Sequence, residues 1–292
     1  MDWKMPRRLA TWLLALTGLA VGVHAVHAIA GPDHGRLDAF FDDWFTLIPQ
    51  AAAAGLCFAR AATERRARGA WTAFGVGLVL WSLGDLAWSL WLANLDEPPY
   101  PSVADGLYLA AYVALYVGIM LLLRERLHAI TRHAWLDGLI GACSVAALAA
   151  AFVFPTVIGA TEGSPAAIAT TLAYPALDVV MLSFVILAML LRRGRREPIW
   201  ILLAAGLVLM ALADSLASYQ QALGTYREGT LLDTAWPAAM LLIAIAAWRP
   251  HRAISGWATG GVALWLPGIF CLPALLLLLD AGVEHVAPAA VA

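Results

Sequence analysis

The feature that most constrains this chain is a succession of long apolar segments separated by short connectors. A helix needs about 20 apolar residues to cross the hydrocarbon core of a bilayer. Nine segments are long and apolar enough to be candidates: 9–30, 43–61, 71–94, 105–123, 135–158, 168–191, 199–222, 231–248 and 260–283. We therefore predict an all-α fold, a polytopic transmembrane helix bundle of nine spans, with residues 1–292 as one integral membrane domain.

Composition supports a membrane location. Of the 292 residues, 62% are hydrophobic and 13% are charged, whereas soluble domains carry about 25% charged residues. The lipid bilayer is thus the expected surrounding, and we expect no nucleic-acid partner. The three cysteines lie far apart inside apolar runs and have no metal-ligand spacing. We read them as small buried apolar residues.

The basic residues indicate how the segments are oriented. Of the 18 lysines and arginines, all but two lie in the N-terminal tail or around the connectors that follow the second, fourth, sixth and eighth segments. The two exceptions are Arg36 and Arg227. Because positively charged loops stay in the cytoplasm, we predict a plasma-membrane protein with a cytoplasmic N-terminus.

Both ends of the chain need an interpretation. The start resembles a signal peptide, with basic residues, an apolar run and then VHAVHA. We expect it to stay uncleaved as the first span, and the alternative of cleavage is left open. At the other end, VAPAAVA (286–292) reads as the beginning of a tenth span that is cut short. We therefore expect the chain to be a fragment of a longer protein.

Four short segments recur at nearly equal intervals. LIPQA (47–51), AYVAL (111–115), AYPAL (173–177) and AWPAA (235–239) have their third residues 64, 62 and 62 positions apart. This indicates a helical hairpin of about 62 residues used four times, at roughly 9–61, 71–123, 135–191 and 199–248. In three of the segments the third residue is a proline, and we expect Pro49, Pro175 and Pro237 to bend their spans.

Three aspartates lie inside predicted spans. A charged side chain at the centre of a span costs at least about 2.5–3.5 kcal/mol, so such residues face the bundle interior and mark function. At about 1.5 Å rise per residue, Asp85, Asp178 and Asp214 lie roughly 14, 15 and 12 Å from the outer ends of their spans. No lysine or arginine lies in a span at that depth. The acids need protons, hydrogen-bond donors, His24 or His27, a bound cation or a ligand to neutralise them.

The neighbours of these acids are polar at helical spacing, and residues three or four apart share a helix face. We predict a polar, aromatic cavity in the outer half of the membrane, which takes a small ligand, a proton or an ion. The predicted lining is Asp85, Ser89, Tyr108, Tyr112, Tyr116, Tyr174, Asp178, Asp214 and Ser218. The alternative is that each aspartate only ties neighbouring helices together. We interpret Asp105 and Asp233 as caps at the starts of their spans.

No catalytic residue is predicted. The chain has no P-loop, HExxH, GxSxG or glycine-rich dinucleotide turn. We expect no cofactor and no metal site, with His24 and His27 as the only, weak, candidates for metal ligands. Whether a longer parent protein is an enzyme is left open.

Several motifs together resemble a known family. GDLAWSL, LDEPPYPSVADGLYLAAY, LAYPALDVVML and ALADSLASYQQALGTYREGTLLDTAWPAAM look like the membrane-spanning N-terminal region of actinobacterial signalling proteins with GGDEF and often EAL domains. The resemblance covers roughly residues 70–250. It implies a bacterial sensory or anchoring module coupled to synthesis or hydrolysis of cyclic di-GMP. The chain itself has no GGDEF or EAL motif. A cytoplasmic output domain with these motifs would therefore act in cis or in trans. Whether the protein forms a homodimer is left open.

Two further functions compete with sensing. The same cavity would suit a transporter for a small cationic or polar solute, which also needs access from the cytoplasm. The predicted cytoplasmic halves, such as MLLLR (120–124) and SFVILAMLL (183–191), are almost purely apolar. This favours sensing over transport. A purely structural anchor is the third alternative.

Overall fold

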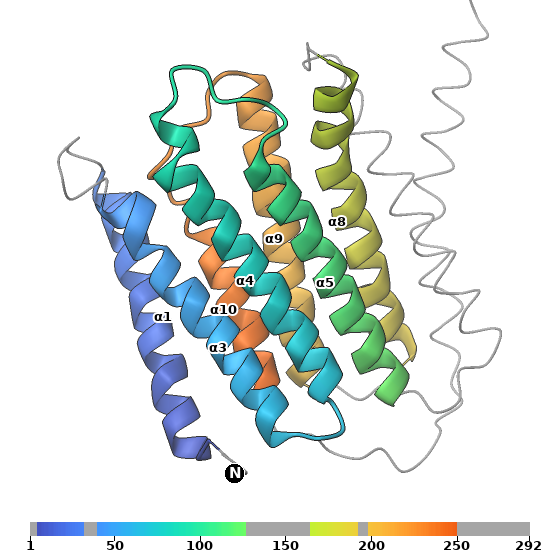
Figure 1. Ribbon diagram of the computed structural model, residues 1–292. Coiled ribbons are helices and arrows are strands. Elements are labelled where there is room, and N and C mark those ends of the chain that lie inside the picture. The colour runs from blue at the N-terminus through green and yellow to red at the C-terminus, as the bar shows by residue number, and fades with distance from the viewer. Residues whose placement is uncertain (1–4, 32–39, 127–163, 192–197, 250–292) are drawn as a thin grey trace, which may run out of the picture.

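The computed structural model describes residues 5–31, 40–126, 164–191 and 198–249. A short π-helical turn, η1 (Phe40–Phe45), precedes α3, and a 3-10 turn, η2 (Leu92–Asn94), follows α4. The described residues contain no strand, so the all-α prediction is confirmed for them. The α-helices are α1 (Arg7–Ala30), α3 (Leu47–Thr63), α4 (Arg68–Leu90), α5 (Val103–Arg126), α8 (Pro165–Leu191), α9 (Pro198–Ala222) and α10 (Ala235–Ala247) (Figure 1).

Six stretches of the described residues are long and apolar enough to cross a membrane, and they indicate a membrane protein. α10 is also apolar but has only 13 residues, because the chain forms turns up to Thr234 instead of the helix predicted from residue 231. The predicted spans 135–158 and 260–283 lie outside the described residues. The count of nine spans and the fourfold repeat therefore stay predictions. The six stretches are Arg7–Ala30, Phe40–Thr63, Arg68–Asn94, Val103–Glu125, Pro165–Phe184 and Pro198–Gln221.

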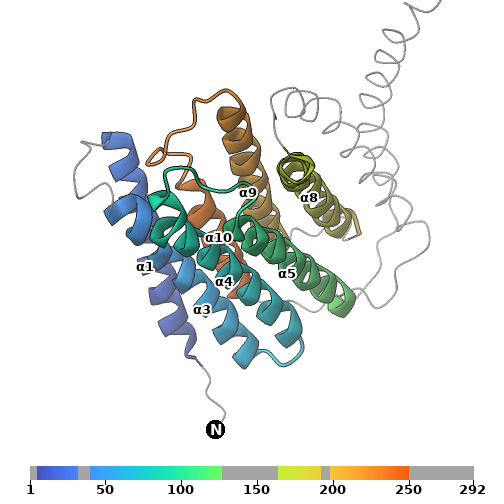
Figure 2. The same cartoon turned by 45° about the horizontal axis from the view of Figure 1, so that its top comes forward.

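Six of the helices close into a ring. In order around it, α3, α4, α5, α8, α9 and α10 each pack against the next, and α10 packs back against α3. α1 lies outside the ring, against α3 and α10, while α8 lies at the opposite side beside α5 (Figures 1 and 2). The outward face of α1 exposes large apolar residues such as Trp12 and Leu19, which suits contact with lipid.

The two ends of the ring differ in composition. We call one the arginine end, because α1 begins there at Arg7 and the α3–α4 connection there contains Arg65 and Arg66. We call the other the loop end, because the connections 95–102 and 223–234 lie there (Figure 1). The structure contains no membrane, so which end faces the cytoplasm stays a prediction.

The half of the ring nearer the arginine end has an apolar core. Its side chains come from all six ring helices, and they meet in the interior with almost no exposed surface. Close packing of this kind holds transmembrane helices together by van der Waals contact. The core residues of this half are Cys57, Trp71, Phe74, Leu78, Leu115, Ile119, Leu122, Met181, Leu203, Leu207 and Ile243.

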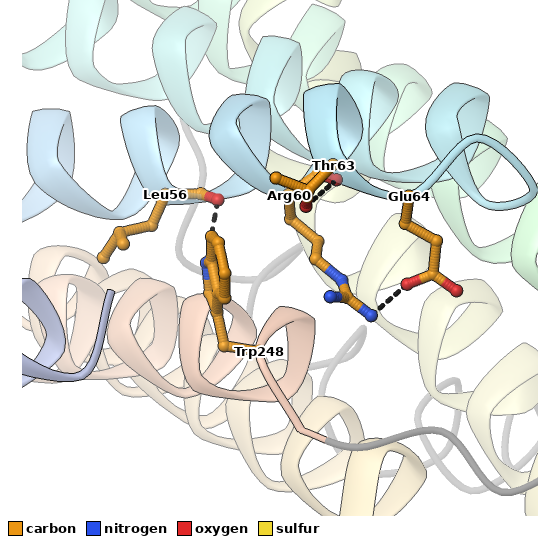
Figure 3. Close-up of polar contacts among 5 residues, drawn as sticks. All are labelled: Leu56, Arg60, Thr63, Glu64 and Trp248. Atoms are coloured by element: carbon orange, nitrogen blue, oxygen red, sulfur yellow. Dashed lines mark hydrogen bonds and ion pairs between the residues drawn. The ribbon is translucent and has the colours of Figure 1, made fainter. Parts of the chain in front are cut away.

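A polar clamp ties α3 to the end of α10 within this apolar half (Figure 3). Trp248 Nε1 donates a hydrogen bond to the carbonyl oxygen of Leu56 at 3.1 Å. The Arg60 guanidinium lies 5.7 Å from the centroid of the Trp248 ring and forms an ion pair with Glu64. A cation in the last turn of α3 also interacts favourably with the helix dipole. The clamp therefore satisfies a half-buried charge while it holds two ring helices together.

A close approach between α9 and α10 gives a test of this packing. A Cβ atom added at Gly206 would lie 2.9 Å from the carbonyl oxygen of Ala239. We expect Gly206→Ala to lower the free energy of unfolding by about 1–3 kcal/mol, because backbone must move. Reversible unfolding in detergent micelles measures this.

Gly106→Ala on α5 is the matched control, because a Cβ there meets open space. Alanine has a higher helix propensity than glycine, so this variant should be neutral or gain up to about 1 kcal/mol. Equal effects of the two substitutions would contradict the close approach of α9 and α10.

Candidate functional site

The loop end fixes the register of α5 through a capping box. The backbone N–H and the hydroxyl of Ser102 both donate to Asp105 Oδ2 at 2.7 Å. This arrangement satisfies a free amide at the helix start, as the sequence predicts for Asp105. From there Tyr108, Tyr112 and Tyr116 follow at intervals of four residues, which places all three on one face of α5.

A similar turn precedes α10. The Thr230 N–H donates to Asp233 Oδ2 at 2.8 Å, and Tyr226 donates to Asp233 Oδ1 at 2.7 Å. Burial, with the Asp233 carboxylate beside it, raises the pKa of Tyr226, so this phenol keeps its proton and acts as a donor. The connection is tied to α4 by Trp88, whose Nε1 donates to Glu228 at 3.0 Å.

The first carboxylate inside the ring is Asp85 on α4. Gln50 on α3 donates its Nε2 hydrogen to Asp85 Oδ2, and Tyr108 on α5 donates its hydroxyl hydrogen to Oδ1, each at 2.7 Å. The Tyr108 ring can reach Asp85 because residue 84 is a glycine, where a Cβ would lie 2.4 Å from the ring. Asp85 thereby joins three helices.

The second group is centred on Tyr112, which is completely buried. Its hydroxyl lies 2.6 Å from Asp178 Oδ1 on α8 and 2.5 Å from Asp214 Oδ2 on α9. Trp236 on α10 donates its Nε1 hydrogen to Asp214 Oδ1 at 2.7 Å. Trp81 lies next to both the Tyr108 and the Tyr112 ring, at centroid distances of 5.0 and 6.0 Å.

Together the two groups take one or more side chains from every helix of the ring. We call them the polar network and define it by these bonds. Its members are Gln50 on α3, Asp85 on α4, Tyr108 and Tyr112 on α5, Asp178 on α8, Asp214 on α9 and Trp236 on α10.

The other predicted site residues have different positions. Tyr116 donates to the carbonyl oxygen of Leu177 on α8. Tyr174 shares a helix face with Asp178 in the prediction, but its hydroxyl instead donates to Asp105 Oδ1 on α5 at 2.8 Å. Ser89 and Ser218 are half-buried, one helical turn further toward the loop end than Asp85 and Asp214.

Two members of the network are missing from the sequence prediction. Trp236 is the second residue of the repeated segment AWPAA, the position that Tyr112 and Tyr174 occupy in AYVAL and AYPAL. All three donate to an aspartate. The aromatic second residue of the repeated segments was therefore the signal in the sequence that could have identified Trp236. Gln50 is the only strongly polar residue in LIPQA.

The prolines of these segments differ in effect. Pro49 and Pro237 are each the third residue of their helix, in the first turn, where a proline loses no hydrogen bond. α3 and α10 begin later than the apolar segments do, so neither proline lies in the interior of its α-helix. A bend in the outer thirds of these spans stays a prediction. Pro175 does lie inside α8, three residues before Asp178.

The two histidines near the end of α1 have packing roles. His24 is buried, and its Nδ1 lies 2.8 Å from Thr234 Oγ1 at the start of α10. His27 stacks on Phe41 with ring centroids 4.2 Å apart. Within the described part of the chain, no group of three His, Cys, Asp or Glu side chains could hold a metal ion.

Two pockets lie along the outer face of α3 and are almost purely apolar. One, of about 480 Å³, is lined by residues including Leu13 and Phe58, and the second, of about 390 Å³, by residues including Phe58 and Leu83. Neither is lined by an aspartate. The side chains of the polar network instead contact one another directly.

A comparison with known proteins finds no matching family, no matching curated relative and no matching solved structure. The function is therefore argued from the geometry of the polar network.

The shared role of Tyr112 generates a prediction for stability. We expect Tyr112→Phe to lower the free energy of unfolding by about 1.5–3 kcal/mol, because two buried carboxyl groups lose their common partner. Tyr219→Phe is the control, because Tyr219 is 49% exposed and surface changes stay within about 0.5 kcal/mol. Unfolding in detergent micelles with increasing amounts of denaturant measures the free energy of unfolding of both variants. A Tyr112→Phe protein as stable as the control would contradict the bonding described.

Proposed function

We propose that this chain is the membrane-embedded sensory or anchoring module of a bacterial signalling protein, and that the polar network is its sensing element. In this proposal the module has nine spans built from repeated hairpins, lies in the plasma membrane and has its N-terminus in the cytoplasm. The observation that carries the proposal is that two groups of hydrogen bonds, which share helix α5, together reach all six ring helices.

This geometry supports sensing because the network couples local chemistry to helix packing. Each bond joins side chains from different helices, so a change of charge or ligation at one carboxyl group alters the contact between at least two helices. A stimulus shifts a protein between two packings only if it binds them with different affinity. Carboxyl groups buried among helices meet that condition, because their charge is costly in the membrane.

Transport is the alternative, and the packing does not favour it. A transporter opens its site alternately to both sides of the membrane. Between the polar network and the arginine end, the ring is filled by buried apolar side chains such as Phe74, Leu115 and Leu207. A polar solute would have to displace this core to pass.

The proposed output is cyclic di-GMP signalling, on the basis of the sequence resemblance. A GGDEF or EAL domain, in cis or on a partner, would receive the signal at the arginine end. Four ring helices, α3, α5, α8 and α10, run toward that end. A homodimer would bring two such modules together.

The proposal predicts that the network controls output. We expect Asp214→Asn to change cellular cyclic di-GMP by about fivefold or more, the lower end of ordinary allosteric coupling, when the full reading frame is expressed with a fluorescent cyclic di-GMP reporter. Asp96→Asn is the matched control, because Asp96 is exposed in the loop 95–102. Equal cyclic di-GMP levels in the two variants, at equal abundance in the membrane, would contradict a role of the polar network in sensing.

A second measurement separates sensing from transport. We expect purified protein in sealed vesicles to show no uptake of small cations or polar solutes. Uptake that requires Asp85 and Asp214 would instead favour the transporter.

A further inference from the structure

We propose that Asp178, Tyr112 and Asp214 bind one proton between them, with Asp178 as the carboxylic acid. The ligand of this site is then a proton. Its role as the stimulus of a sensor rests on the proposed function, whereas its presence in the folded protein rests on geometry alone.

The count of hydrogen atoms carries the argument. The Tyr112 hydroxyl lies 2.6 Å from one carboxyl oxygen and 2.5 Å from the other. Both are distances of O–H···O hydrogen bonds, which need a hydrogen atom between the oxygens. A phenol has one hydrogen and can donate it to only one of the two. The second hydrogen must come from a protonated carboxyl group that donates to the tyrosine oxygen.

The remaining bonds decide which aspartate is protonated. Both oxygens of Asp214 have a partner, because Trp236 contacts Oδ1 and Tyr112 contacts Oδ2. Asp178 is only 3% exposed, and its Oδ2 has no hydrogen-bond partner among the described residues. An ionised carboxylate with a bare buried oxygen is costly, whereas a neutral acid tolerates it better. The chain of donors thus runs from Asp178 through Tyr112 to the Asp214 carboxylate.

Within the part of the chain that the structure describes, the surroundings of the triad supply no other neutralising group. The titratable side chains of the described segments that face this triad are all acidic or phenolic: Tyr116 on α5, Tyr174 on α8 and Asp85 on α4. No ion pair recorded in the described segments involves Asp178 or Asp214. A metal ion is also disfavoured, because the same segments hold no group of three suitable ligands.

Release of the proton has a mechanical consequence. Two ionised carboxylates would then face one hydroxyl hydrogen, and the repulsion would act between α8 and α9, which pack together, and on α5. Protonated and deprotonated triads therefore favour different packings of these three helices.

Infrared spectroscopy tests the bound proton directly. We expect the purified full chain in lipid nanodiscs at neutral pH to show the C=O band of a buried carboxylic acid, shifted in heavy water. Asp178→Asn should remove this band. Asp105→Asn is the matched control and should retain it, because both Asp105 oxygens accept hydrogen bonds. Absence of the band from the native protein, or its survival in Asp178→Asn, would overturn the proposal.

Stability as a function of pH gives a second test. A folded state that holds one proton more than the unfolded chain loses stability as the pH rises. We expect the native protein to lose stability progressively as the pH rises above about 4, the ordinary pKa of an unfolded aspartate. Asp178→Asn should lack this loss, because an asparagine amide donates to Tyr112 without titrating. At about pH 4, where the unfolded aspartate also binds a proton, Asp178→Asn should melt within about 2 °C of the native protein, and Asp214→Asn should melt several degrees lower. Equal effects of the two variants would overturn the assignment of the proton to Asp178.

The outcomes also separate this proposal from the proposed function. If the infrared band disappears in Asp178→Asn but Asp214→Asn leaves cyclic di-GMP unchanged, the proton site is supported and the proposed sensory function is contradicted. If Asp214→Asn changes cyclic di-GMP but the native protein shows no carboxylic acid band, the sensory function is supported and the proton site is contradicted. Should Asp178→Asn fail to fold, the spectra of the native protein in light and heavy water decide alone.

Discussion

The Tyr112 hydroxyl, held between Asp178 and Asp214, is the interaction on which the loop-end half of the ring depends. In a membrane, carboxyl groups are tolerated only where other groups satisfy them. Here every side chain that donates to Asp85, Asp178 or Asp214 lies on another helix than the acid itself. Each acid therefore fixes how its helix packs against its neighbours. The half nearer the arginine end has no such bonds among its core side chains and is held by close packing. One ring therefore combines a polar, specific half with an apolar, tightly filled half.

The repeated segments acquire a chemical meaning from this arrangement. Their second residues, Tyr112, Tyr174 and Trp236, each donate to an aspartate on another helix. In the first segment that position is Ile48, which has no donor, and Gln50 two residues later donates to Asp85 instead. Tyr108 and Trp236 donate to Asp85 and Asp214 within their own predicted hairpins. The Tyr112 and Tyr174 hydroxyls instead contact acids in other predicted hairpins. These bonds between predicted hairpins favour the closed ring over separate pairs of helices.

The sequence predicts the helices well, because length and apolarity are properties of a single segment. It also places Asp85, Asp178 and Asp214 at similar depth, since depth depends only on distance along a helix. It does not predict partners, because these depend on how each helix is rotated against its neighbours. Tyr174 shows the limit: it lies one turn from Asp178 yet donates to Asp105 on α5. Gln50 and Trp236 were missed because an uncharged amide or indole gives no charge signal, although either can satisfy a carboxylate.

The apolar half then determines how a change in the network can reach the arginine end. A close-packed core is not continuously deformable, so small displacements are converted into shifts between discrete arrangements. Tyr112 and the core residues Leu115, Ile119 and Leu122 belong to the same helix, α5, and lie on its buried side. A displacement of Tyr112 by a change of charge at Asp178 would therefore move side chains that are packed against α4 as well. Among the described residues this core is filled by buried apolar side chains, which fits the proposed sensor better than a transporter.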